Sequence, residues 1–283
     1  MSIEICIVAF GSESYLVDWF AQARKIDASL AIADNHPTGS TIAACQQHDA
    51  DEGVVVRTLA LPHNPGFGAA CNALAASSSA DWLVFLNPDA TIVTFPENML
   101  QLGSVFGAYQ RKPDGQAVHC SGQSYRVRDE ISRGWLRRMP HPANGRGYVS
   151  GGAMAIARSE FLALGGFDER MFLFYEDIDL CIRAGRSGKR VLLHPEWRVI
   201  HEVGHATRRD WTTALTTSYE SGRYFHTKHR HCVRGFDAYV AADSLARSLC
   251  STLLRNRPKR AAYLGLARQA LRNLFRCCRP GEV

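Results

Sequence analysis

Short apolar runs alternate with amphipathic stretches along the first 90 residues. Four runs rich in β-branched and aromatic residues predict buried strands: "IEICIVAF", "SLAIADN", "VVVRTLAL" and "DWLVFLN". Stretches with the spacing of a helix lie between some of them, namely "YLVDWFAQARKI" and "GFGAACNALAASS". Alternation of strands and helices is typical of βαβ units. The pattern therefore predicts an α/β fold with a mostly parallel sheet flanked by helices.

Polar residues follow three of these predicted strands directly. They are Asp34 and Asn35, His63 and Asn64, and Asn87 and Asp89. Pro88 supports a strand end at Leu86, because proline cannot continue a central strand. In sheets of this kind, ligands bind outside the carboxyl ends of the strands. We therefore expect the polar residues to line one cleft.

A nucleotide diphosphate suits such a cleft. Asp34 can accept hydrogen bonds from a ribose or a base edge, and the small residues around Gly66 let a ligand approach the backbone closely. Asp89 can hold a divalent cation together with the phosphate oxygens of a substrate. The alternative is that Asp34, Asn64 and Asp89 only cap helices and form turns, as such residues often do. Each motif taken alone leaves both interpretations open.

Three acids crowd the start of a predicted helix in the second half of the chain. The segment "FLFYEDIDLCIRAG" predicts a helix that begins near Glu176 and ends at Gly185. Its first turn contains Glu176, Asp177 and Asp179, and the helix dipole stabilises acids at this position. An aromatic environment also suits a general base, since apolar surroundings raise the pKa of a carboxyl group.

Six motifs occur in the order seen in one enzyme family. They are "LAIADN", "HNPGFGAACNALAA", "WLVFLNPDA", "VSGGAMAIAR", "GGFDERMFLFYEDIDLCIRA" and "VIHEVGHA". Over roughly residues 3–206 the chain resembles the family 2 glycosyltransferases with the GT-A fold, most closely the bacterial rhamnosyltransferase-like branch. The combination of "LNPD" with "GGFDE" and "YEDIDLCIR" is far more specific than any single motif. The resemblance implies a Rossmann-like GT-A domain.

The resemblance also implies an activity and a set of site residues. It implies inverting transfer of a sugar from a nucleotide-sugar donor, with Asp177 as the base on the acceptor hydroxyl and Glu176 as a possible orienting group. The residues that it places beside the nucleotide sugar are Asp34, Asn64, Gly66, Asn72, Asn87, Asp89 and Gly152. Phe10 and Gly11 stand where the family often has Tyr-Asn, so the contact with the nucleobase is expected to differ.

A divalent cation, Mg²⁺ or Mn²⁺, is implied on the donor diphosphate. Asp89 matches the last Asp of the family's Asp-x-Asp signature, which here reads Asn87-Pro88-Asp89 and keeps one carboxylate. His201 lies where many members place a histidine that faces the metal. An ordinary histidine at a strand end is the alternative for His201, and His205 is a rival candidate.

Bulk composition limits the class of protein. A chain of 283 residues with 46% hydrophobic residues can bury one large α/β core. The first residues, "MSIEICIVAF", fit neither a signal peptide nor a spanning helix. The nine cysteines contain no CxxC pair, and "HTKHRHC" lacks the partner pair of a zinc finger. We expect a soluble protein of the reducing cytosol.

The net charge of +6 is concentrated at the carboxyl end. Nine Arg and Lys residues follow Ser244, against the single acid Glu282, and leucines recur among them at helical spacing on both sides of Pro258. Such helices can lie on an anionic bilayer, or they can dock on the main domain with solvated arginines. Nucleic acid is not expected as a partner, because no recognised nucleic-acid motif accompanies the basic segment.

These observations predict two domains and one activity. We expect a GT-A domain at residues 1–235 and a basic helical tail at 236–283, with the basic segment 126–147 forming a mobile loop near the acceptor. The expected donor is dTDP-rhamnose. The expected acceptor is a saccharide or a polyprenyl-diphosphate-linked saccharide of a bacterial cell envelope, met at the inner face of the cytoplasmic membrane.

Three alternatives to that activity stay open. One is a family 2 transferase that uses a UDP- or GDP-linked sugar. Another is a sugar-nucleotide nucleotidyltransferase, but "AFGSESYL" lacks the glycines and the cation which that class needs after its first strand. The third is a non-catalytic binder of nucleotide sugars, which would not need the acids of "YEDID".

Overall fold

The chain packs as two compact units. The computed structural model describes residues 1–283 except 49–52, 124, 135–142, 205–210, 254–255 and 277–283. One unit consists of residues 1–124 with 139–209, and the other of residues 125–138 with 210–283.

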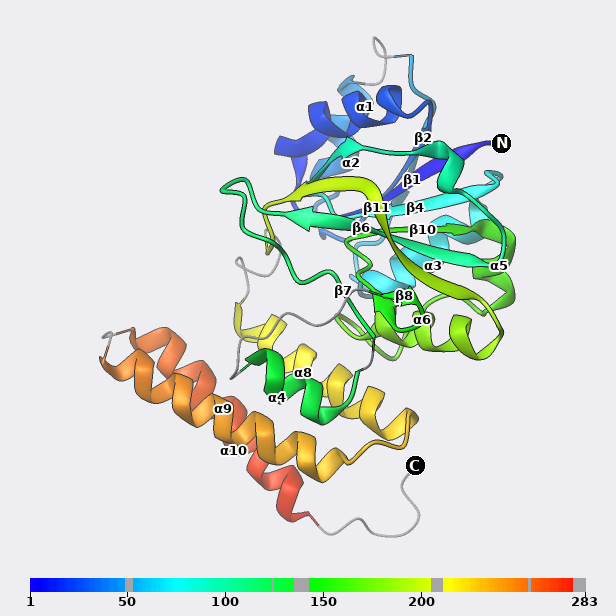
Figure 1. The fold of residues 1–283 in the computed structure, drawn as a ribbon. Helices are drawn as coiled ribbons and strands as arrows, with labels where there is room; N and C mark the ends of the chain where they lie inside the picture. Colours follow the sequence, from blue (N-terminus) through cyan, green and yellow to red (C-terminus); the bar gives the residue numbers. More distant parts are fainter. Residues whose placement is uncertain (49–52, 124, 135–142, 205–210, 254–255, 277–283) are drawn as a thin grey trace. The chain divides into compact units, whose positions relative to one another are not determined.

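A central sheet forms the first unit (Figure 1). Within the described residues it has nine strands in the order β3-β2-β1-β4-β10-β6-β11-β5, with β8 paired to β11. The bounds are β1 (Ile3–Ala9), β2 (Ser29–Asp34), β3 (Val56–Ala60), β4 (Trp82–Leu86), β5 (Ala90–Thr94), β6 (Ser104–Arg111), β8 (Asn144–Gly145), β10 (Ala153–Ala157) and β11 (Arg190–His201). A small second sheet pairs β7 (Ser121–Gly122) with β9 (Tyr148–Val149).

The sheet combines a parallel half and a mixed half. Strands β3, β2, β1 and β4 are parallel to their neighbours, as the βαβ pattern predicts. Strand β10 is antiparallel to both β4 and β6, whereas β11 is parallel to β6 and antiparallel to β5. In the register of the first three strands, Ala9, Asp34 and Ala60 lie level. The carboxyl ends of these strands therefore meet at one edge of the sheet.

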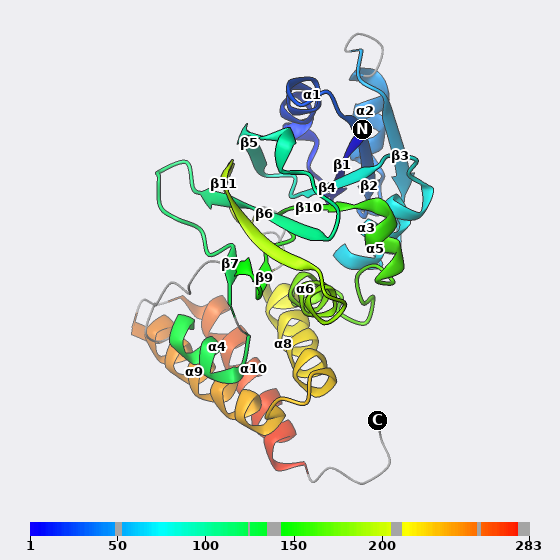
Figure 2. The same ribbon diagram turned by 45° about the vertical axis from the view of Figure 1, so that its right-hand side comes forward.

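Helices cover both faces of this sheet (Figure 2). They are α1 (Leu16–Lys25), α2 (Ser40–His48), α3 (Phe67–Ser77), α5 (Arg158–Ala163) and α6 (Glu176–Arg186), with short 3₁₀ turns at Glu13–Tyr15 and Glu97–Met99. Because side chains alternate along a strand, Ile5 and Ile7 share a buried cluster with Trp19 of α1, whereas Cys6 faces Cys71 of α3. The predicted limits of β4 and the predicted start of α6 are confirmed.

The second unit is helical. It contains α4 (Val127–Gly134), α8 (Trp211–Lys228), α9 (Val233–Leu253) and α10 (Arg257–Phe275), and α9 and α10 run side by side in both views. Pro258 lies in the first turn of α10, where proline suits a helix, and the side chain of Asn256 accepts from Lys259 N at 3.2 Å. The domain boundary expected at residue 235 stays a prediction.

Part of the segment expected as a loop is a helix. Residues 127–134 form α4, and the expected mobile segment also includes residues 135–142, which lie outside the described part. The reason for the helix is local: the carboxylate of Asp129 accepts a hydrogen bond from Arg126 N at 2.7 Å and so caps the first turn. Among the described residues, no helix is both long enough and apolar enough to cross a membrane.

Candidate active site

A buried carboxylate–imidazole pair lies at the end of β4. Asp89 Oδ1 is 3.1 Å from Nε2 of His201, and Asn87 Nδ2 is 3.2 Å from the same nitrogen. The two chain segments meet because the end of β11 pairs with the start of β5, where His201 is opposite Ala90. Trp19 of α1 donates from Nε1 to the carbonyl of Pro88 at 2.9 Å, which fixes the turn.

Gln110 orients the ring of His201 from the opposite side. Its Oε1 lies 2.7 Å from Nδ1 of His201, and both side chains are buried. An amide oxygen only accepts, so Nδ1 carries a proton. An amide nitrogen only donates, so Asn87 Nδ2 at 3.2 Å implies a lone pair on Nε2, on the side that Asp89 also contacts. Histidines that bind metals commonly donate their other ring N–H to an oxygen in this way.

The donor set of this pair fits a divalent cation that shares its ligands with a substrate. With the proton on Nδ1, His201 Nε2 and Asp89 Oδ1 present two lone pairs to each other at 3.1 Å. A cation is favoured beside two such acceptors, and carboxylate oxygen is a ligand for Mg²⁺ and Mn²⁺. Across the described ranges, no group of three His, Cys, Asp or Glu side chains could hold a metal. Further ligands would have to come from the substrate.

Asp177 is tied to this pair through two consecutive glycines. Its Oδ2 accepts from Gly151 N at 2.8 Å, and its Oδ1 accepts from Ile178 N at 2.7 Å. The next residue, Gly152, lies where an added Cβ would be 3.1 Å from Asn87 Nδ2 and 3.2 Å from a ring carbon of His201. One turn therefore contacts both the candidate base and the candidate metal ligands.

The chain enters α6 through a strained turn. Phe174 and Tyr175 have φ values of 69° and 71°, a conformation that bulky side chains rarely adopt and that costs about 1–3 kcal/mol each. Such strain is typical of functional sites. The turn directs Glu176 into the interior and leaves Asp177 beside Gly151.

Glu176 is a buried neighbour of the candidate base. It is 5% exposed, lies against Gly68 and, in the described part of the chain, its Oε2 has no hydrogen-bond partner. Burial, and to a smaller extent the charge of Asp177, raises the pKa of Glu176 well above its usual range. A protonated Glu176 adds no second negative charge beside Asp177. Its orienting role stays a prediction.

Asp34 caps a helix at the end of β2. Its carboxylate accepts from the backbone N–H groups of His36, Thr41 and Ile42 at 3.0, 2.9 and 3.3 Å. The last two groups belong to the first turn of α2, so the capping interpretation is observed directly. The contact between Asp34 and a nucleotide stays a prediction.

Asn64 and Gly66 shape the loop before α3. Asn35 donates from Nδ2 to Asn64 Oδ1 at 3.0 Å and to the carbonyl of Gly66 at 3.2 Å. Gly66 has a φ of 97°, and a Cβ there would collide with the carbonyl oxygen of Phe172. Phe67 N donates to that same oxygen at 3.0 Å. The loop is thus packed directly on the segment that leads to Asp177.

Asn72 uses its amide within the protein. Its Nδ2 donates to the carbonyl of Phe167 at 2.9 Å, and its Oδ1 accepts from Phe167 N at 2.8 Å. Nδ2 also donates to Glu169 at 3.0 Å. These bonds join α3 to the "GGFDE" turn, and a nucleotide contact of Asn72 stays a prediction. The rival candidate His205 lies outside the described residues.

Sequence reasoning missed Gln110 and Gly151. Gln110 lies in a strand whose pattern indicates only burial, and nothing nearby in sequence points to His201. Gly151 had a usable signal, since it precedes Gly152 in the "VSGGA" motif.

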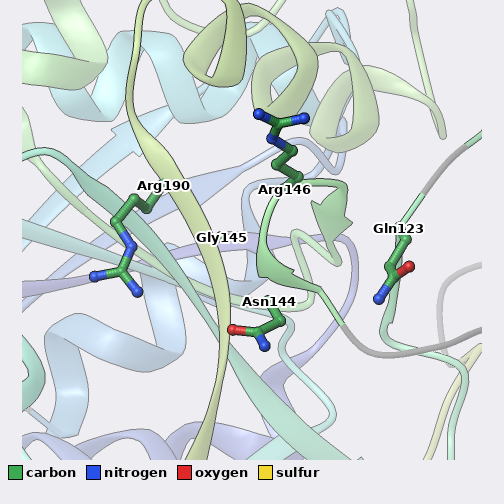
Figure 3. Close-up of a pocket in the computed structure, with 5 residues that line it drawn as sticks. All are labelled: Gln123, Asn144, Gly145, Arg146 and Arg190. Carbon is green, nitrogen blue, oxygen red and sulfur yellow. The ribbon is translucent and has the colours of Figure 1, made fainter.

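A separate pocket lies near the start of β11. Its volume is about 540 Å³, and it is lined by Gln123, Asn144, Gly145, Arg146 and Arg190 (Figure 3). None of these is a predicted site residue. Arg190 and His201 are the first and last residues of β11, so this pocket and the Asp89–His201 pair lie at opposite ends of one strand.

The α/β sheet with helices on both faces is the fold of the GT-A glycosyltransferases. The chain belongs to the family whose model is described as glycosyl transferase family 2, which matches residues 4–146. This confirms the resemblance and the α/β GT-A fold.

Similar proteins are found by sequence and by structure. An N-acetylglucosaminyl-diphospho-decaprenol L-rhamnosyltransferase of Mycobacterium tuberculosis is 27% identical over 247 residues, which cover 74% of this chain and 77% of the relative. Rhamnosyltransferase WbbL of Escherichia coli is 33% identical over 91 residues, or 32% and 34% of the two chains. The mannosyltransferase PcManGT of Pyrobaculum calidifontis, solved with GDP-Man and Mn²⁺, has a TM-score of 0.55 and 13% identity. The match covers 96% of this chain and 87% of the mannosyltransferase. GalNAc-T7 with UDP, GalNAc and Mn²⁺ has a TM-score of 0.56 and 15% identity, and the match covers 80% of this chain and 50% of GalNAc-T7. At such identities the solved structures show the fold alone.

Proposed function

We propose that this glycosyltransferase transfers L-rhamnose from dTDP-rhamnose, with inversion, to a saccharide or a polyprenyl-diphosphate-linked saccharide in the synthesis of a bacterial cell-surface polysaccharide. The proposal is supported by the names of the relatives in Mycobacterium tuberculosis and Escherichia coli, both rhamnosyltransferases. The first of these names also includes a lipid diphosphate, which supports a lipid-linked acceptor.

The turn at Gly151 and Gly152 contacts both the candidate base and the candidate metal ligands, and the proposed mechanism depends on it. Inversion requires that the acceptor hydroxyl attack from the side opposite to the leaving diphosphate, so base and leaving-group contacts must come from different elements. Asp177 on α6 accepts the proton of the acceptor hydroxyl. Asp89 and His201 would hold Mg²⁺ or Mn²⁺, which when bound supplies charge neutralisation at the diphosphate. Gly151 and Gly152 fix Asp177 relative to that pair.

The nucleotide-sugar contacts form the second part of the proposal. Asp34, Asn64 and Gly66 lie at the same edge of the sheet as Asn87 and would line the nucleotide. We assign the transferase to residues 1–235 and a separate role to the basic tail at 236–283. The enzyme would act in the cytoplasm at the inner face of the membrane, where a nucleotide sugar and a lipid-linked acceptor can meet.

A thermal-shift screen with product analysis tests the donor and the metal. The purified chain is compared with Asp89→Asn and with Asp18→Asn, a control at an exposed carboxylate of α1, against dTDP-, UDP- and GDP-linked sugars with and without Mn²⁺. We expect a Mn²⁺-dependent shift with dTDP-rhamnose that Asp89→Asn loses and Asp18→Asn retains. A shift with a UDP- or GDP-linked sugar instead would overturn the assignment of dTDP-rhamnose as the donor. Donor binding without transfer to any saccharide would favour a non-catalytic binder.

A further inference from the structure

Helix α9 has its polarity reversed in its C-terminal half. Phe236 near its start is buried, but all three of its leucines point outward: Leu245, Leu249 and Leu253 are 46%, 65% and 77% exposed. They follow one another at intervals of four residues, so they form one row along the helix. The buried residues of the same helix include three serines, at 244, 248 and 251. In a helix whose partners are all in the protein, the leucines would occupy the inner face.

The buried serines have a packing explanation that the exposed leucines lack. Small residues let α9 and α10 approach closely. The hydroxyl of Ser248 donates to Arg260 O of α10 at 3.5 Å, and the hydroxyl of Ser251 donates to Arg247 O within α9 at 2.8 Å. The leucine row gains nothing from this contact. Exposed alanines continue its apolar character along the helix, at positions 238, 242 and 246. An exposed contiguous apolar surface of this kind marks an interaction site.

The charge of the second unit indicates what the row contacts. Residues 125–138 and 210–283 contain 18 Arg and Lys against seven Asp and Glu, a formal charge of +11, whereas the remainder of the chain carries −5. The exposed cations of α10 are Arg257, Lys259, Arg260, Arg268 and Arg272. The acids of α9 are already paired, Asp243 with Arg247 at 2.6 Å and Asp237 with Arg223 at 2.8 Å. The unit therefore suits an anionic surface.

We infer that α9 docks on an anionic lipid bilayer, with Leu245, Leu249 and Leu253 entering the interface and the cations of α10 contacting lipid headgroups. An apolar row with neighbouring cations is the pattern of an interfacial helix, and lipid headgroups attract such cations. None of the described helices can cross a membrane, so the contact would be peripheral. A second copy of the chain is a poorer occupant, because two units of charge +11 repel each other.

Vesicle flotation tests this inference with the full-length chain. The triple variant Leu245→Gln, Leu249→Gln, Leu253→Gln is compared with Val55→Gln, Leu102→Gln, a control that replaces side chains 75% and 74% exposed in the first unit. Vesicles contain phosphatidylcholine with or without phosphatidylglycerol. We expect the wild type and the control to bind the anionic vesicles, and the triple variant to bind at least about tenfold more weakly.

Each other outcome overturns the inference. If the triple variant binds as tightly as the wild type, the leucine row does not contact the bilayer. If the wild type shows no preference for anionic vesicles, the cations of α10 do not contact lipid headgroups. A wild-type dimer that becomes a monomer in the triple variant, seen by analytical ultracentrifugation, would assign the face to a second copy.

The inference rests on the proposed function only for its lipid-linked acceptor, and a further measurement separates the two. Transfer to a short, water-soluble acceptor should be equal in the wild type and the triple variant. If vesicle binding follows the expectation but no rhamnosyl transfer occurs in either protein, the proposed function fails and the docking surface stands. If transfer occurs but the leucines do not affect vesicle binding, the docking surface fails alone.

Discussion

The backbone N–H of Gly151 donates to Oδ2 of Asp177 at 2.8 Å, and the following residue packs against Asn87 and His201. Two adjacent glycines thus position the candidate base and the candidate metal pair, although these come from distant parts of the sequence. Side chains at either glycine would enter the space between them, because Gly151 and Gly152 would place a Cβ 3.3 and 3.1 Å from their neighbours. The turn acts as a common support for the candidate base and the candidate metal pair.

Asp177→Asn should slow transfer strongly while donor binding persists. The amide keeps the size of the side chain but cannot accept the proton of the acceptor hydroxyl, so we expect the rate to fall about 10²- to 10⁴-fold. Steady-state transfer and donor titration measure the two effects, with Asp18→Asn as the control. Transfer at the wild-type rate would show that Asp177 is not the base.

Replacement of Gln110 should change the proton position on His201. In Gln110→Leu the acceptor for Nδ1–H is lost, whereas Gln110→Glu retains one. We expect the ¹⁵N shifts of His201 to report mixed tautomers in the Leu variant, and Mn²⁺ affinity in the presence of dTDP to fall about 10- to 100-fold. If the ¹⁵N shifts of His201 and the Mn²⁺ affinity are unchanged in Gln110→Leu, then Gln110 does not orient His201 and contributes only to packing.

Glu176→Gln should stabilise the protein increasingly as the pH rises. The pKa of Glu176 is raised by burial, so the native state retains its proton while the unfolded chain loses it above a pH of about 4.5. The wild type therefore loses about 1.4 kcal/mol per pH unit relative to the variant, until the native pKa is reached. Denaturation of both proteins across this range tests the sign. A stability difference independent of pH would mean that Glu176 is ionised in the native state.

The second unit should lose stability below a pH of about 6.5 through His226. Burial, followed by the charges of His231 and His229, lowers the pKa of His226 to about 3. The native state stays neutral at this residue while the unfolded chain takes up a proton, so stability falls as the pH decreases towards 3. Hydrogen-exchange protection of α8 should decline less steeply in His226→Gln than in the wild type. The exposed His63→Gln serves as control, and parallel wild-type and His226→Gln profiles would refute the assignment.

Gly66→Ala should be more destabilising than Gly188→Ala. Both glycines have positive φ, 97° and 85°, so both substitutions carry backbone strain of about 1–3 kcal/mol. Only at Gly66 does the added Cβ meet the carbonyl oxygen of Phe172, whereas Gly188 faces open space. The difference in free energy of unfolding measures the cost of that contact. Equal destabilisation would show that the loop before α3 can shift away from Phe172.

Local signals explain which parts of the fold could be predicted. The strand that ends at Leu86 and the helix that begins at Glu176 are set by adjacent residues, Pro88 in the first case and the acids of the first turn in the second. The sequence does not indicate that β10 lies antiparallel between β4 and β6, since strand order depends on contacts far apart in the chain.

The site shows the same division between local and distant information. Asp89 and Asp177 lie in motifs, whereas the bond between Gln110 and His201 joins residues 91 positions apart without any pattern near either one. The reversed polarity of α9 was hidden for a related reason. Leucines at helical spacing indicate an apolar face, but not whether the protein or something else covers it.

The contact of Gly66 with Phe172 has a consequence for enzyme engineering. The backbone of the loop before α3 and the segment before α6 are joined by the bond from Phe67 N to Phe172 O, with no room for a Cβ between them. An exchange of residues 63–68 alone would therefore misfit the segment at Phe172. The two segments pack as one structural unit, so an exchange should transfer residues 172–175 together with the loop.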